Sequence, residues 1–231
     1  MKGKIITIEG TDCSGKETQA RKTVERLQLE GYQIQYVCFP NYDTPTGKIV
    51  GGPYLGKETI CDGYFSEGAS HVDPLVASLY YAADRRYNLP EILNYINNGV
   101  SVIIDRYCDS NMAHHGGKLK TKEERLTLYE KLCTLEYDIL ELPKPDEIIF
   151  LYVPCDKVKE LKEQRQLTEK LDQHEQDPEH LKNAENAYLE LAKLHNYHTI
   201  NCLNENDSMR TIDDINEEVY TIVKKTLRKE L

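Results

Sequence analysis

The chain has 231 residues, of which 39% are hydrophobic and 29% charged, and its formal net charge at pH 7 is −10. These values predict one globular α/β domain over residues 1–231. The acidic balance argues against a nucleic-acid polymer as partner, because such proteins carry a basic stripe. No apolar run reaches the ~18 residues that would make a membrane partner plausible. Seven irregularly spaced cysteines, with no CxxC pair and no export signal, predict a cytoplasmic protein with reduced thiols.

Short β-rich runs alternate along the chain with longer stretches of helical spacing. The expected strands are Ile5–Ile8, Ile34–Phe39, Val102–Ile104, Ile148–Val153 and Thr199–Cys202. After the first run, Ala20, Val24 and Leu27 recur at i, i+4 and i+7, and Ile212–Leu227 has a similar amphipathic pattern. The alternation predicts a five-stranded parallel sheet with helices on both faces, in three layers. Ligands of such sheets bind beyond the carboxyl ends of the strands.

Two segments fit this pattern poorly. Residues 43–73 are rich in Gly, Pro and Tyr and have weak periodicity. Residues 157–179 are highly charged and have few large apolar side chains, which is typical either of a solvated helix or of a mobile lid.

A phosphate-binding loop is expected directly after the first strand. The pattern GxxxxGK needs two glycines for a tight turn, backbone N–H groups aimed inward at a helix start, and a lysine that reaches the β and γ phosphates. Glu17 stands where a Ser or Thr normally binds Mg²⁺, and Thr18 comes one residue later. The residues expected to bind ATP are Gly10, Asp12, Cys13, Ser14, Gly15, Lys16, Glu17 and Thr18.

Four segments together resemble the motifs of the thymidylate kinase family of P-loop nucleoside monophosphate kinases. They are IEGTDCSGKETQ at 8–19, FPNY at 39–42, YYAADR at 80–85 and DRYCDSNMA at 105–113. The resemblance implies a P-loop NTPase fold with a lid at about 157–179. It also implies a homodimer that uses Mg²⁺ and transfers phosphate from ATP to dTMP, forming ADP and dTDP.

The resemblance also implies roles for charged residues. Arg106 would clamp the dTMP phosphate, and Asp12 would contact the acceptor's 3′-hydroxyl or its metal. Asp105 would organise Mg²⁺ through water. In the lid, Arg165 would neutralise the transferring phosphoryl group, and Glu175 would bind metal or substrate. The expected catalytic residues are Lys16, Arg106, Arg165 and Asp12; the expected metal-binding residues are Asp12, Asp105 and Glu175.

For the thymine base, Tyr81 offers a stacking face, and Arg85, one helical turn later, can donate to a ring carbonyl. Asn111 carries both a donor and an acceptor for the N3 edge of the ring, with Ser110 beside it. The complete expected acceptor site is Asp12, Phe39, Tyr42, Tyr81, Arg85, Arg106, Ser110, Asn111, His114 and Glu175.

Several positions depart from commoner family members. Asn41 and Tyr42 stand where an arginine often holds the acceptor phosphate, and His114 where an aromatic residue usually crowds the sugar 2′ position. Cys13 replaces a catalytic arginine or a glycine. Two alternatives therefore stay open: a kinase for another pyrimidine nucleotide, and a low-turnover nucleotide-binding protein. A regulatory GTPase predicts an Asn-Lys-x-Asp motif, which the sequence lacks.

Overall fold

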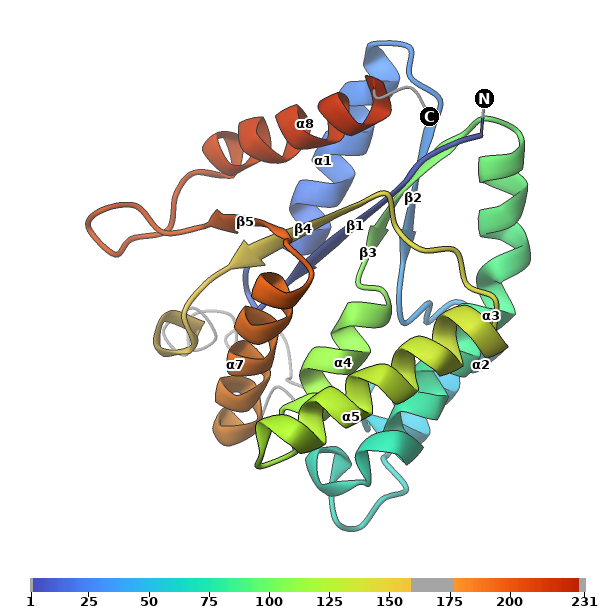
Figure 1. Cartoon of the computed structure of the whole chain (residues 1–231), viewed down its shortest axis with the longest axis vertical. Coiled ribbons are helices and arrows are strands. Elements are labelled where there is room, and N and C mark those ends of the chain that lie inside the picture. The colour runs from blue at the N-terminus through green and yellow to red at the C-terminus, as the bar shows by residue number, and fades with distance from the viewer. Residues whose placement is uncertain (1, 159–176, 229–231) are drawn as a thin grey trace.

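The computed structural model, drawn in Figure 1, describes residues 2–158 and 177–228. Its five strands are parallel and lie in the order β2-β3-β1-β4-β5. All five expected strands are confirmed, with ends that differ by no more than two residues. Their bounds are β1 Ile5–Gly10, β2 Ile34–Cys38, β3 Ser101–Asp105, β4 Glu147–Tyr152 and β5 His198–Asn201.

Helices cover both faces of the sheet, as the alternating pattern predicts (Figure 1). The α-helices are α1 Lys16–Leu29, α2 Pro45–Ile49, α3 Pro74–Asn97, α4 Cys108–Gly116, α5 Lys122–Cys133, α7 Pro178–Leu194 and α8 Ile212–Arg228. Two π-helical segments are η1 Val50–Tyr54 and η3 Thr134–Ile139, and η2 Ala69–His71 is a 3₁₀ turn. No helix within residues 2–158 and 177–228 is both long and apolar enough to cross a membrane.

The central strand β1 packs against helices on both faces of the sheet and so holds the three layers together. Its six residues are all buried, as expected for a strand covered on both faces. Side chains alternate between faces, so Ile6 and Ile8 pack with α1 and α8, whereas Ile5 packs with α3. A further apolar cluster joins α4, α5 and α7 around Phe150 of β4. The carboxyl ends of β1 and β3 therefore lie between helices that are anchored to the core.

The weakly periodic segment 43–73 is compact and anchored to α3. The buried carboxylate of Asp84 accepts from the backbone N–H of Asn41 at 2.8 Å and from the Thr46 hydroxyl at 2.8 Å. A Cβ on Gly47 would lie 1.8 Å from the Asn41 carbonyl oxygen, so only glycine permits this close approach. These contacts fix the loop that follows β2.

The expected lid lies mostly outside the described residues, which exclude 159–176. Of its last residues, Asp177 caps α7 through its side chain and Pro178 is the first helical residue. Proline tolerates that position, where its missing N–H is not needed.

Candidate active site

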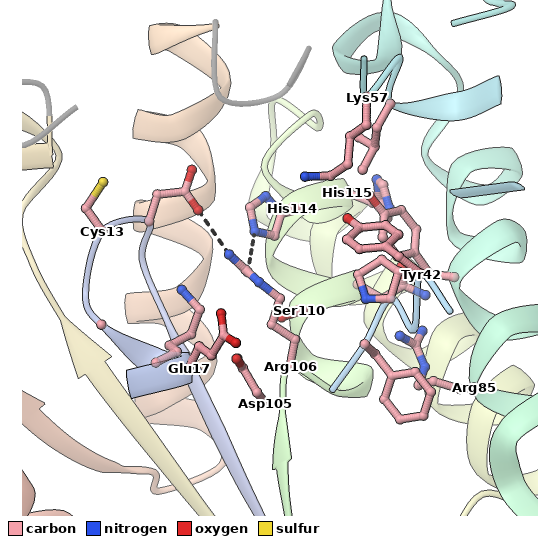
Figure 2. A pocket seen from close by; sticks show the side chains of 18 of the residues that line it. Cys13, Glu17, Tyr42, Lys57, Arg85, Asp105, Arg106, Ser110, His114 and His115 are labelled. Atoms are coloured by element: carbon pink, nitrogen blue, oxygen red, sulfur yellow. Dashed lines mark hydrogen bonds and ion pairs between the residues drawn. The ribbon is translucent and has the colours of Figure 1, made fainter. Parts of the chain in front are cut away.

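A pocket of about 550 Å³ opens at the carboxyl ends of β1 and β3 (Figure 2). Its wall comes from the loop after β1, the segment after β2, and helices α3 and α4. The lining residues are Asp12, Cys13, Gly15, Lys16, Glu17, Thr18, Phe39, Pro40, Tyr42, Leu55, Lys57, Tyr81, Arg85, Asp105, Arg106, Ser110, Asn111, His114 and His115. Four expected site residues are missing from this wall. Gly10 and Ser14 are buried within the loop, and Arg165 and Glu175 lie outside the described residues.

At both glycine positions of the phosphate loop, the local geometry requires a residue without a side chain. Gly15 has a φ of 78°, in the left-handed region that favours glycine. A Cβ on Gly10 would lie 2.6 Å from the Leu151 carbonyl oxygen and 2.6 Å from the Ser14 hydroxyl. The loop therefore packs tightly on β4 and delivers the chain into α1, whose first N–H groups point toward the pocket.

Lys16 is a buried cation at the base of this loop. Its ammonium donates to the Thr11 carbonyl at 2.9 Å. Burial is the main factor that lowers the pKa of Lys16 to about 8, and Arg106 lowers it further, while Asp12 and Asp105 oppose the change. An anion beside this ammonium would raise the pKa of Lys16 again.

Arg106 crosses the pocket from the end of β3 toward the phosphate loop. One guanidinium nitrogen lies 3.0 Å from the Asp12 carboxylate and the other 3.3 Å from Nε2 of His114 (Figure 2). Arginine has only donors, so Nε2 of His114 accepts and its Nδ1 carries the proton. Nδ1 of His114 lies 3.3 Å from Nε2 of His180 and donates to it, which links Arg106 to the first turn of α7.

A buried carboxylate, Glu9, holds the turn that carries Arg106. Its two oxygens accept from the Tyr107 backbone N–H at 2.7 Å, the Ser110 hydroxyl at 2.5 Å and the Tyr188 hydroxyl at 3.1 Å. Burial, and next the charge of Asp109, raises the pKa of Glu9 to about 7. The Ser110 hydroxyl is thus engaged in this network, although the residue also lines the pocket.

Asp105 has the features of a metal-organising carboxylate. The residue is 8% exposed, and its Oδ1 atom has no hydrogen-bond partner among the described residues. Its Oδ2 atom accepts from the Tyr36 hydroxyl at 3.3 Å, and burial raises its pKa. In the described part of the chain, no three His, Cys, Asp or Glu residues are grouped to hold a metal. A single buried carboxylate such as Asp105 fits Mg²⁺, because this ion keeps several waters and binds mainly to phosphates and to one or two carboxylates.

Glu17, which replaces the usual Ser or Thr, is exposed and ion-paired with Arg21 at 2.8 Å. The Arg21 guanidinium also lies over the Tyr36 ring, 4.1 Å from its centroid. Glu17 lines the pocket at the start of α1, and Figure 2 shows it next to Asp105.

The opposite end of the pocket is suited to a flat heterocycle. Asn111 donates through its amide nitrogen to the Ser78 carbonyl at 3.1 Å and to Glu136 at 2.9 Å. These two acceptors fix the amide orientation, and Oδ1 remains a buried acceptor without a partner among the described residues. Arg85 is 2% exposed and forms a bidentate pair with Glu136, with its Nε donating at 2.8 Å. Tyr81 packs edge-on against Tyr54 at 5.7 Å.

Four lining residues were not predicted as site residues: Pro40, Leu55, Lys57 and His115. Pro40 stands within the quoted FPNY motif. Leu55 and Lys57 come from the weakly periodic segment 43–73, and His115 follows directly after His114. Only proximity to a motif could have indicated Pro40 and His115, and nothing in the local pattern singled out Lys57.

Asn204–Arg210 is a polar loop after the last strand, which we interpret from the sequence as an adenine-binding loop, and it forms a tight hairpin after β5. Leu203 and Met209 form an antiparallel bridge, and Arg210 pairs with Glu218 of α8. These residues are not part of the pocket wall, so their expected role stays a prediction.

The buried pair of Arg85 and Glu136 generates a prediction about stability. Glu136→Gln leaves the buried guanidinium without its counter-charge, so the free energy of unfolding should fall by about 3–5 kcal/mol. Urea denaturation followed by circular dichroism measures it. Asp138→Asn, at an exposed position two residues on, is the matched control. If Glu136→Gln lowered the free energy of unfolding no more than this control does, Glu136 would not be the stabilising partner of Arg85.

The raised pKa of Glu9 predicts how the stability of the protein changes with pH. Its pKa rises from 4.5 to about 7 in the folded protein. The stability from this group is therefore complete below pH 4.5 and is lost as pH rises through about 7. Glu9→Gln removes the titration. The unfolding free energy of the wild type minus that of the variant should decrease by about 3 kcal/mol across this window. If the unfolding free energies of the two proteins changed with pH in the same way, the raised pKa of Glu9 would be contradicted.

Comparisons with known proteins agree with this geometry. The thymidylate kinase family model matches residues 8–212. Human thymidylate kinase is 33% identical over 150 residues, which span 65% of this chain and 61% of that protein. The Plasmodium falciparum enzyme is 32% identical over 66% of this chain and 63% of its own length. A probable thymidylate kinase from Pyrococcus horikoshii is 28% identical over 98% of both chains.

The chain thus spans about three fifths of the length of the human and Plasmodium proteins in these alignments. In structure, it is similar to thymidylate kinase from Candida albicans, with a TM-score of 0.68 over 97% of this chain and 92% of that one. The 24% identity of that pair supports the P-loop NTPase fold alone. Because the family model covers most of the sequence, this chain belongs to the thymidylate kinase family.

Proposed function

We propose that the chain transfers the γ-phosphoryl group of ATP to dTMP in the cytoplasm, releasing ADP and dTDP. The observation that carries the proposal is a continuous pocket. It joins a phosphate loop with a buried lysine to a crossing arginine and then to a site for a flat base. An odd number of irregularly spaced cysteines fits a reducing compartment.

The donor end would hold ATP by its phosphates. Backbone N–H groups at the start of α1 and the Lys16 ammonium bind β and γ oxygens. Mg²⁺, when bound, supplies charge neutralisation on the phosphates. Asp105 would organise its waters through Oδ1, and Asp12 would assist from the loop tip. We further propose that Arg165 neutralises the transferring group and that Glu175 binds metal or substrate.

The acceptor phosphate would take the place of Asp12 on Arg106. The guanidinium is planar and can present two parallel N–H groups to a phosphate. Asp12 would then be released toward the sugar 3′-hydroxyl. His114 keeps the guanidinium from rotating by accepting from its other nitrogen. The reaction needs no protein nucleophile, since alignment and charge neutralisation account for most of phosphoryl transfer.

Base selection would rest on Asn111 and Arg85. The buried Oδ1 acceptor of Asn111 matches the N3–H donor of thymine, whereas cytosine presents a lone pair at N3. Arg85, oriented by Glu136, would donate to a ring carbonyl, and Tyr81 would contribute an aromatic wall. Uracil offers the same N3–H group, so these contacts favour thymine and uracil over cytosine.

Two substitutions should separate the donor site from the acceptor site. Lys16→Ala should abolish ATP-dependent turnover, because the γ-phosphate loses its buried cation. Arg106→Ala should mainly raise KM for dTMP and lower kcat, because the acceptor phosphate loses a charged bidentate contact of about 1.5–3 kcal/mol. Coupled ADP release under varied ATP and dTMP measures both. Wild-type rates in Lys16→Ala, or unchanged dTMP parameters in Arg106→Ala, would contradict the assignments.

A modified acceptor tests base recognition without altering the protein. N3-methyl-dTMP lacks the N3–H donor, which leaves the Asn111 acceptor buried and unpaired. We expect kcat/KM to fall by about 10- to 100-fold relative to dTMP. The control is dUMP, which keeps the N3–H group and should be used far better than N3-methyl-dTMP. Equal use of N3-methyl-dTMP and dTMP would show that Asn111 does not read this edge.

We also propose a homodimer through the outer face of α3. That face exposes Leu75, Val76 and Leu79, at 40–48% of their surface, in a helix otherwise anchored to the sheet. Sedimentation velocity should give twice the chain mass of 26.7 kDa. Leu79→Glu should shift the protein toward monomer. Leu29→Glu on α1, where the side chain is 91% exposed, should not. A monomeric wild type would refute the dimer.

A further inference from the structure

Lys57 is a cation in the wall of the pocket that neither the motifs nor the roles proposed above use. It follows η1, and its backbone is firmly held. Its N–H donates to the Gly51 carbonyl at 2.8 Å, and its carbonyl accepts from Ile60 at 2.8 Å and from Cys61 at 3.1 Å. In Figure 2 its side chain descends from the wall opposite the phosphate loop and directs its ammonium toward the open middle of the pocket.

The Lys57 ammonium lies over the aromatic ring of Tyr42, 5.0 Å from the ring centroid. This is within cation–π range. The ring itself rests on the same turn that carries Lys57, because a Cβ on Gly51 would lie 2.9 Å from two of its carbon atoms. Tyr42 and Lys57 are therefore positioned by one short stretch of backbone.

The other cations of the pocket have places in the site described above. Arg85 faces the buried carboxylate of Glu136, and Arg106 faces Asp12. Lys16 belongs to the phosphate loop and donates to the Thr11 carbonyl. A phosphate monoester carries about −1.5 to −2 charges at pH 7. The single positive charge of the Arg106 guanidinium does not balance that charge, and the Tyr42 hydroxyl offers only a neutral hydrogen bond.

We propose that Lys57 binds the phosphate of the acceptor nucleotide, with the Tyr42 ring as its platform. This inference rests on the proposed function and names a residue that completes the acceptor site. The monophosphate would lie between Arg106 on one wall and Lys57 on the other. The lysine provides the point charge, and the arginine provides the directional contact. The segment 43–73 thereby contributes directly to recognition of the acceptor.

Isothermal titration of the full chain with dTMP and with thymidine tests the proposal. Lys57→Met keeps the length of the aliphatic stem and removes the charge. It should weaken dTMP binding by about 10- to 100-fold, the range for one hydrogen bond to a charged group. Thymidine binding should not change, because thymidine has no phosphate. Lys57→Arg should restore most of the dTMP affinity.

Lys48→Met is the matched control, because Lys48 is an exposed lysine in the same segment and not part of the pocket wall. It should bind dTMP like the wild type. Tyr42→Leu removes the platform and should also weaken dTMP binding. Combined with Lys57→Met it should add little, because both changes remove one contact.

Three outcomes would overturn the proposal. Unchanged dTMP binding in Lys57→Met would show that the lysine does not reach the phosphate. Equal losses for dTMP and thymidine would mean that the substitution disturbs the pocket as a whole. A loss confined to ATP would assign Lys57 to the donor. A wild-type protein that binds no nucleoside monophosphate would instead refute the proposed function, and the inference with it.

Discussion

The pocket depends on the turn after β3, where a buried carboxylate of β1 holds the backbone that carries Arg106. Arg106 has a φ of 63°, which is unfavourable for a residue with a side chain. Its N–H donates to the Ile8 carbonyl at 3.1 Å, and the next N–H donates to Glu9 at 2.7 Å. These bonds to the central strand fix the direction in which the guanidinium leaves the sheet. A conformation of this kind persists when its surroundings over-determine it, as is common at functional sites.

On the acceptor side of the pocket, the two arginines are each held in place by side-chain partners. Arg85 is locked by Glu136 at the base end, and Arg106 spans the middle between Asp12 and His114. The Asp12 contact is the one that a phosphate can replace, since Asp12 stands on the loop tip and keeps about a tenth of its side chain exposed. Interactions between charges are stronger in the low-dielectric interior of a protein than at its surface. The geometry therefore prepares the site for an anion before it binds.

Local sequence patterns were enough to predict the sheet and the phosphate loop, and the family resemblance indicated most of the other residues that line the pocket, whose roles stay predictions. The strand at residues 5–8 and the GxxxxGK motif rest on neighbours within a few positions, and the structure keeps both. The pairing of Arg85 with Glu136 joins residues 51 positions apart, and no periodicity encodes it. Lys57 was missed because its segment lacks regular spacing, and its place over the Tyr42 ring comes from the tertiary packing of that segment. Arg165 and Glu175 stay predictions, because they lie outside the described residues.

We propose that one pocket aligns ATP with a thymine monophosphate. The most direct test is coupled ADP release with ATP and Mg²⁺ against dTMP, dUMP, UMP, dCMP, dGMP and thymidine. We expect turnover that is strongest with dTMP, clearly weaker with dCMP and dGMP, and absent with thymidine, which brings no phosphate to Arg106. Comparable turnover with dCMP, or no turnover with any acceptor despite measurable nucleotide binding, would contradict it.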